Sequence, residues 1–195
     1  MRVIGIDLAG SKKRPTGFCV LEKNKVKTSL LFSDKEIIEE TLKSKPKVVA
    51  IDAPLALPIG RKSLEERSNI HLRECDRELL KIGIKFFPIT LGPMRALTKR
   101  GIKLRKIFEN KGLKVIEVYP GAAQDILKIP RKQKGIEKLR DGLINFGIKG
   151  IKEKITGDEL DAITSALVGK FYLEGNCIAI GDPKEILMIL PKIKK

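Results

Sequence analysis

Apolar residues occur along this chain in short runs, and three of those runs end in an acidic residue. The runs and their acids are residues 3–6 with Asp7, residues 48–51 with Asp52, and residues 115–116 with Glu117. Runs of this length that are rich in β-branched residues are typical of buried strands. Because burying an unpaired carboxylate is costly, an acid at each strand end indicates chemistry rather than packing.

The remaining apolar pattern predicts a hairpin and a series of helices. Residues 17–22 and 25–32 read as two strands around the turn Lys23-Asn24. Ser33 and Glu36 form a capping box that predicts the start of a helix. Apolar residues at helical spacing predict further helices over residues 61–82, about 97–112, 122–128, 136–146 and 158–173. A terminal hairpin is predicted within residues 177–190.

Hairpin strands followed by strands that alternate with helices indicate an α/β fold with a mixed sheet. We expect three antiparallel N-terminal strands and further parallel strands, flanked by helices, in a single domain over residues 1–195. Residues 59–112 would be a helical insertion within that domain. The functional edge should lie at the C-terminal ends of the parallel strands.

The net charge of the chain indicates what kind of partner it would bind. The chain has 40 Lys and Arg against 24 Asp and Glu, a formal net charge of +16, and such an excess attracts polyanions such as DNA or RNA. The alternative is a lysine-rich thermophilic composition, in which Lys and Glu rise together. Here Lys rises without matching Glu, which favours nucleic acid as the partner.

Several classes of protein are disfavoured by composition. No apolar run approaches the ~20 residues that span a bilayer, so no membrane partner is expected. Asp7 and Lys12 interrupt any signal-peptide core, and we expect a cytoplasmic protein. Three distant cysteines argue against a disulfide framework, and His71, the single histidine, argues against a histidine metal site.

A fourth acidic group lies near the C-terminus. Asp158 and Asp161 are three residues apart and share one helical face. Together with the strand-end acids they predict a carboxylate cluster for Mg²⁺ or Mn²⁺, which prefer oxygen ligands. Two such ions catalyse phosphodiester hydrolysis, with Asp7 bridging both ions and Asp52 and Asp161 each completing one. Asp158 or Glu117 would assist these three residues at the metal site.

Each acid also has a structural alternative. Asp158 is a candidate N-cap after Gly157, and Asp161 would favour the helix dipole. Glu117 would pair with an arginine, and Asp52 would simply precede a turn forced by Pro54. Asp7 would cap the turn at Gly10-Ser11. The conjunction of acids at matching strand ends favours the metal cluster.

Basic residues predict where nucleic acid would be held. Arg73 and Arg77 lie one helical turn apart and are candidates to grip phosphate, whereas the alternative is an ion pair between Arg73 and Asp76. A basic helix face would follow the nucleic-acid backbone, or else be solvated surface. Its residues are Lys99, Arg100, Lys103, Arg105 and Lys106.

Six motifs, taken in order, resemble one known family, the domain of unknown function 429. They are Gly5 to Ser11, Ile51 to Leu55, Arg73 to Arg77, Glu117 to Pro120, Asp158 to Ala162, and Gly181 to Pro183. The resemblance covers essentially the whole chain. It implies a nuclease of the RNase H-like fold, which is how that family is classed.

The wider superfamily includes RuvC-type Holliday-junction resolvases, and the match there is residue by residue. Their pattern is an Asp on the first strand, an acid ending the fourth strand, and Asp-x-x-Asp-Ala on the last helix. Asp7, Asp52, Asp158 and Asp161 match these elements. The second position is commonly glutamate, and Asp52 is one methylene shorter.

Two other functions compete with the nuclease. A phosphotransferase of the actin and sugar-kinase type would use residues 7–11 as a phosphate-binding hairpin. It needs two such domains around one nucleotide, so this chain would have to form a homodimer. A catalytically inactive protein would bind nucleic acid without metal dependence and without cleavage.

Overall fold

A seven-stranded mixed sheet forms the centre of the protein. The computed structural model describes residues 1–192, and residues 193–195 of the expected domain lie outside that part. The strand order is β3-β2-β1-β4-β5-β7-β6. The strands are β1 (Arg2–Asp7), β2 (Thr16–Glu22), β3 (Lys25–Leu31), β4 (Val48–Asp52), β5 (Val115–Val118), β6 (Cys177–Ile180) and β7 (Met188–Pro191).

The sheet combines both kinds of strand pairing. β2 pairs antiparallel with β1 and β3, while β1, β4, β5 and β7 run parallel, and β6 closes the far edge antiparallel to β7. The predicted mixed sheet, with three antiparallel N-terminal strands followed by parallel ones, is therefore confirmed. In this register Asp7 lies directly beside Asp52, at the C-terminal ends of β1 and β4.

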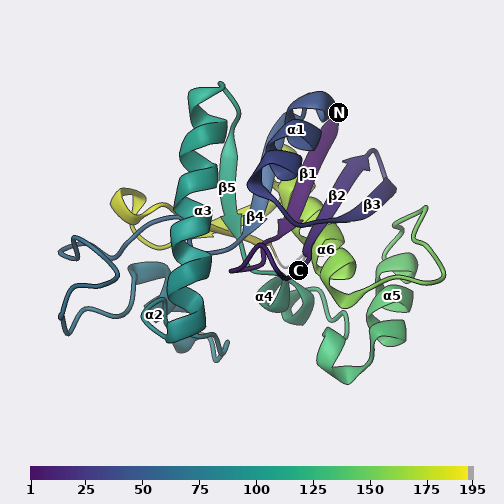
Figure 1. Cartoon of the computed structure of the whole chain (residues 1–195). Coiled ribbons are helices and arrows are strands. Elements are labelled where there is room, and N and C mark those ends of the chain that lie inside the picture. Colours follow the sequence, from purple (N-terminus) through teal and green to yellow (C-terminus); the bar gives the residue numbers. More distant parts are fainter. Residues whose placement is uncertain (193–195) are drawn as a thin grey trace.

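Helices cover both faces of the sheet because its central strands are apolar on both sides. α1 (Asp34–Ser44) and α3 (Gly92–Asn110) pack on one face, where the core includes Ile6, Ile51 and Phe108. α6 (Gly157–Leu173) covers the other face, with α4 (Pro120–Ile126) and α5 (Ile136–Asn145) at its side. Figure 1 shows α3 and α6 on opposite sides of the strands.

Glycines let α6 approach the sheet closely. A Cβ atom at Gly5 would lie 2.0 Å from the carbonyl oxygen of Ala162, and one at Gly17 would lie 2.0 Å from that of Asp158. Only glycine fits at such distances. The first turns of α6, and the acids on them, are thereby held against the C-terminal end of β1.

The predicted helix over residues 61–82 is wrong in its first half. Only α2 (Glu74–Lys81) is helical, and residues 53–73 contain no helix or strand. The buried Arg61 side chain explains the difference, because its guanidinium donates hydrogen bonds to four loop carbonyls, those of Ser63, Leu64, Glu66 and Ile70. A helix would use those carbonyls for its own backbone bonds.

The chain also contains two short 3₁₀ turns, η1 (Lys132–Lys134) and η2 (Pro183–Glu185).

Within residues 1–192, no helix combines the length and the apolar composition needed to cross a bilayer.

Candidate active site

Four acids, two at the ends of neighbouring strands and two near the start of one helix, meet at the C-terminal end of the sheet. Asp7 and Asp52 are supplied by neighbouring strands, and Asp158 and Asp161 by α6. Thr156 is the N-cap of α6, and its hydroxyl accepts from the amide of Glu159. The alternative in which Asp158 is the N-cap is therefore wrong, and the capping role does not account for this acid.

A lysine lies in the middle of these acids. The ammonium nitrogen of Lys132, on η1, is 2.8 Å from Asp161 Oδ2, 3.4 Å from Asp158 Oδ1 and 3.7 Å from Asp7 Oδ2. Three of the predicted metal ligands thus surround one cation position.

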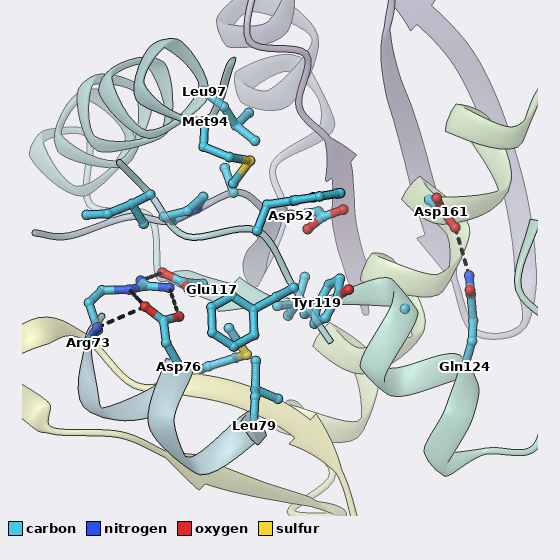
Figure 2. Close-up of a pocket in the computed structure, with 18 of the residues that line it drawn as sticks. Asp52, Arg73, Asp76, Leu79, Met94, Leu97, Glu117, Tyr119, Gln124 and Asp161 are labelled. Carbon is cyan, nitrogen blue, oxygen red and sulfur yellow. Dashed lines mark hydrogen bonds and ion pairs between the residues drawn. The ribbon is translucent and has the colours of Figure 1, made fainter. Parts of the chain in front are cut away.

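The carboxylates differ in how many hydrogen bonds they accept from other residues. Gln124 of α4 donates a 2.7 Å hydrogen bond from Nε2 to Asp161 Oδ1, which fixes that side chain (Figure 2). The half-buried Asp52 carboxylate accepts no hydrogen bond from any group among residues 1–192 and pairs with no cation there. One carboxylate of the group therefore lacks a direct partner among these residues, and the charge of Lys132 acts on it only at longer range.

The pKa values of the two strand-end acids reflect this shortage of positive charge. Burial, together with the charges of Asp161 and Asp158, raises the pKa of Asp7 to about 7, against the opposing effect of Lys132. Burial and the charges of Asp7 and Asp161 raise the pKa of Asp52 well above its usual range. Burial alone would lower the pKa of Lys132, but the surrounding carboxylates hold it above its usual range.

The donor set fits a hard divalent cation by its chemistry. It offers only carboxylate oxygens, and one of them, on Asp52, has no partner among the described residues. As arranged, no three acidic, histidine or cysteine side chains of residues 1–192 form a ready metal-binding group, because Lys132 lies between them. Binding an ion here would require the lysine or the carboxylates to turn to new rotamers.

Glu117 belongs to a different, buried cluster. Its Oε2 atom accepts from Arg73 Nη1 at 2.7 Å and from the amide of Leu55 at 2.8 Å, and Arg73 also pairs with Asp76 at 3.0 Å (Figure 2). Glu117 is thus engaged in holding the segment after β4. Although burial alone would lower it, Glu117 and Asp76 raise the pKa of Arg73 above its usual range.

This geometry decides between the alternatives for Arg73. Only 2% of its side chain is exposed and its guanidinium pairs with Asp76, as in the alternative, so as arranged it is not presented to a phosphate. The second predicted phosphate contact of α2, Arg77, is half-exposed and pairs with Glu74.

The basic residues predicted to form one face of α3 differ in exposure: Arg100 is buried, and Lys99, Lys103 and Lys106 are exposed. Arg100 is buried and donates to Asp34 and to the carbonyls of Ala9 and Phe32, so it joins β1 to α1 and cannot reach a nucleic acid. The exposed members remain accessible. Lys99 pairs with Glu65, Lys103 pairs with Asp34, and Lys106 is exposed with no ion-pair partner among residues 1–192.

Two cavities lie side by side around the acids. One, of about 320 Å³, includes Asp52 and Asp161 in its wall. The other, of about 520 Å³, includes Asp7 and Asp158. They meet at the residues common to both linings, Met94, Leu97 and Lys132.

Sequence reasoning missed Lys132 and Gln124. The stretch from Lys128 to Lys138 is visibly basic in the sequence, which is the signal for Lys132. Nothing in the sequence singles out Gln124, since a buried glutamine on an apolar helix has no distinctive pattern.

Comparison with known proteins supports the fold. No protein-family model and no curated protein sequence matches this chain. Among solved structures it is similar to T. thermophilus RuvC in complex with a Holliday junction substrate. The TM-score is 0.51 at 16% identity, covering 90% of this chain and 96% of that chain. Another Thermus thermophilus RuvC structure gives a TM-score of 0.47 at 16% identity, covering 90% and 97%. The chain therefore has the RNase H-like fold of RuvC, as predicted.

Proposed function

We propose that this protein is a metal-dependent nuclease that hydrolyses phosphodiester bonds in structured DNA or RNA, and that it belongs to the domain of unknown function 429 family. The observation that carries the proposal is the group of three carboxylates around one cation position at the C-terminal edge of the sheet, with a fourth, Asp52, on the strand beside Asp7. Support comes also from the +16 charge and from the fold shared with a junction-bound resolvase.

Asp7, Asp52, Asp158 and Asp161 would hold Mg²⁺ or Mn²⁺. When bound, such ions supply a hydroxide nucleophile and neutralise the charge that develops on the phosphoryl group. The chain's own groups then have separate tasks. Gln124 keeps Asp161 turned toward the edge of the sheet, and Lys132 offers a positive charge to a phosphate oxygen once it leaves the carboxylates.

A cleavage assay tests this function. We expect the wild type to cleave junction, flap or looped substrates of DNA or RNA with Mn²⁺ and to leave them intact in EDTA. Asp7→Asn should lose at least about 100-fold of that activity, because even groups behind a metal ligand are worth about 10- to 100-fold. Asp141→Asn, which changes an exposed acid on α5, is the matched control and should retain full activity.

A catalytically inactive nucleic-acid binder is the second candidate, and the position of Lys132 favours it. An ammonium that already pairs with three of the carboxylates supplies part of the charge a metal would bring. This candidate predicts that Mn²⁺ and EDTA give equal binding and that no substrate is cut. Cleavage by wild type but not by Asp7→Asn would exclude it.

A further inference from the structure

The cavity beside Asp52 and Asp161 combines an apolar surface with polar groups, which include the buried cluster of Arg73, Asp76 and Glu117. Aromatic and aliphatic side chains form about half of its wall, and Figure 2 shows Leu79, Met94, Leu97 and Tyr119 among them. Phe87 stands at this cavity with 71% of its surface exposed. Because most of its surface is exposed and it lines the same cavity as Asp52 and Asp161, the Phe87 ring is available to stack against a ligand.

Tyr119 is held as a fixed wall of this cavity. Its hydroxyl donates a 2.7 Å hydrogen bond to the carbonyl of Lys85, and the guanidinium of Arg131 lies 5.8 Å from its ring centroid. Arg131 is itself paired with Asp125 through two hydrogen bonds. The cavity wall therefore includes an ordered ring and two cations, Arg131 and Lys132, that are paired with carboxylates.

We infer that this cavity receives one unpaired base of the nucleic-acid strand whose phosphodiester bond lies at the carboxylates, an inference that rests on the proposed nuclease function. Bases offer flat apolar faces that stack on aromatic side chains, and a phosphate could take Arg131 or Lys132 from its present carboxylate partners. A volume of about 320 Å³ suits a single small planar group. A base within a duplex is stacked and paired on both sides and cannot enter.

The second cavity could hold the part of the nucleic-acid strand that follows the bound base. It adjoins the first at Met94, Leu97 and Lys132, and its wall includes the exposed residues Ser11 and Arg14. A strand with one base in the first cavity would thus pass its next phosphates over the acids toward Arg14. The substrate class that fits is a strand with an unpaired nucleotide, such as a bulge, flap or loop.

Fluorescence of 2-aminopurine tests the inference without requiring cleavage. A duplex carrying one unpaired 2-aminopurine and the same duplex with that base paired are titrated with protein in EDTA. Wild type should quench the unpaired base by stacking and bind the bulged duplex about tenfold more tightly than the paired one. Phe87→Ala should lose both the quenching and the preference, since aromatic–base stacking contributes an effect of about this size.

The controls separate this inference from the nuclease proposal. Phe32→Ala removes another exposed phenylalanine, which lies outside both cavities, and should behave as wild type. Equal binding of bulged and paired duplexes, absence of binding, or unchanged quenching by Phe87→Ala would overturn the inference. So would tighter binding of free nucleoside monophosphates than of the bulged duplex. Loss of Mn²⁺-dependent cleavage would refute the nuclease alone, because these titrations contain no metal.

Discussion

Two charged clusters lie close together at the strand ends, and they differ in how well their charges are compensated. In the buried cluster, Arg73 meets Asp76 and Glu117, and every carboxylate has a short hydrogen bond. At the acidic edge, the carboxylates of Asp7, Asp158 and Asp161 share the single ammonium of Lys132. Asp52 has no partner among residues 1–192.

The difference indicates separate roles. A compensated, fully hydrogen-bonded cluster fixes the chain, here by joining the start of α2 to β5 and to the loop after β4. A group with excess negative charge opposes folding, which is typical of a functional site rather than of a structural cluster. The two clusters should therefore respond in opposite ways when a charge is removed.

The largest expected effect is on the buried cluster. Arg73→Met should lower the free energy of unfolding by about 3–5 kcal/mol, because Asp76 and Glu117 would be left buried without their cation. Urea denaturation measures it. Arg77→Met, on the same helix but half-exposed, should cost less than about 1 kcal/mol. Equal stability of the two variants would remove the structural role assigned to this cluster.

An effect of opposite sign is expected at the acidic edge. The pKa of Asp7 is raised to about 7, so the native state holds its proton more tightly than the unfolded state. Its contribution therefore lowers metal-free stability as pH rises from about 4 to about 7. Asp7→Asn removes this contribution, so in EDTA it should be more stable than wild type at pH 8, by roughly 4 kcal/mol for a pKa that is raised from about 4 to about 7.

The pH series supplies the control for that prediction. Near pH 4 the Asp7 carboxyl is protonated in the native state and only about half ionised in the unfolded chain, so the two proteins should unfold at similar urea concentrations. A variant that is less stable at every pH would mean that Asp7 is a structural cap or ion-pair partner.

The smallest effect concerns exposed basic residues outside both clusters. Nucleic-acid affinity should fall as salt rises, with a slope of log affinity against log salt of several units. Lys106→Ala should reduce that slope by about one unit if this exposed lysine meets a phosphate. Lys47→Ala changes an exposed lysine on a different part of the chain, and its effect on the same slope is the comparison. A flat salt response of the wild type would count against nucleic acid as the partner.

The parts of the fold that follow local rules were predictable from the sequence. β-branched runs marked the central strands, and the capping box at Ser33 and Glu36 marked α1. The helix expected over residues 61–82 failed because the Arg61 side chain, rather than the backbone, binds the loop carbonyls. Spacing of apolar residues carries no information about such a contact.

The site was predictable as a set of acids but not as an arrangement. The sequence places Asp7 and Asp52 at strand ends, and the parallel register brings them side by side. It gives no sign that Lys132, 125 positions after Asp7, lies between the carboxylates. It also cannot separate Arg73 from Arg77 or Arg100 from Lys99, because burial depends on contacts between distant segments.

Binding of Mn²⁺ to the metal-free protein tests the central claim most directly. Titration followed by the electron paramagnetic resonance signal of free Mn²⁺ measures binding without any substrate or cleavage. The account predicts saturable binding to wild type and to Asp141→Asn, and loss of that binding in Asp7→Asn and Asp52→Asn. Failure of the wild type to bind Mn²⁺, or equal binding by all four proteins, would contradict the claim that these carboxylates form a metal site.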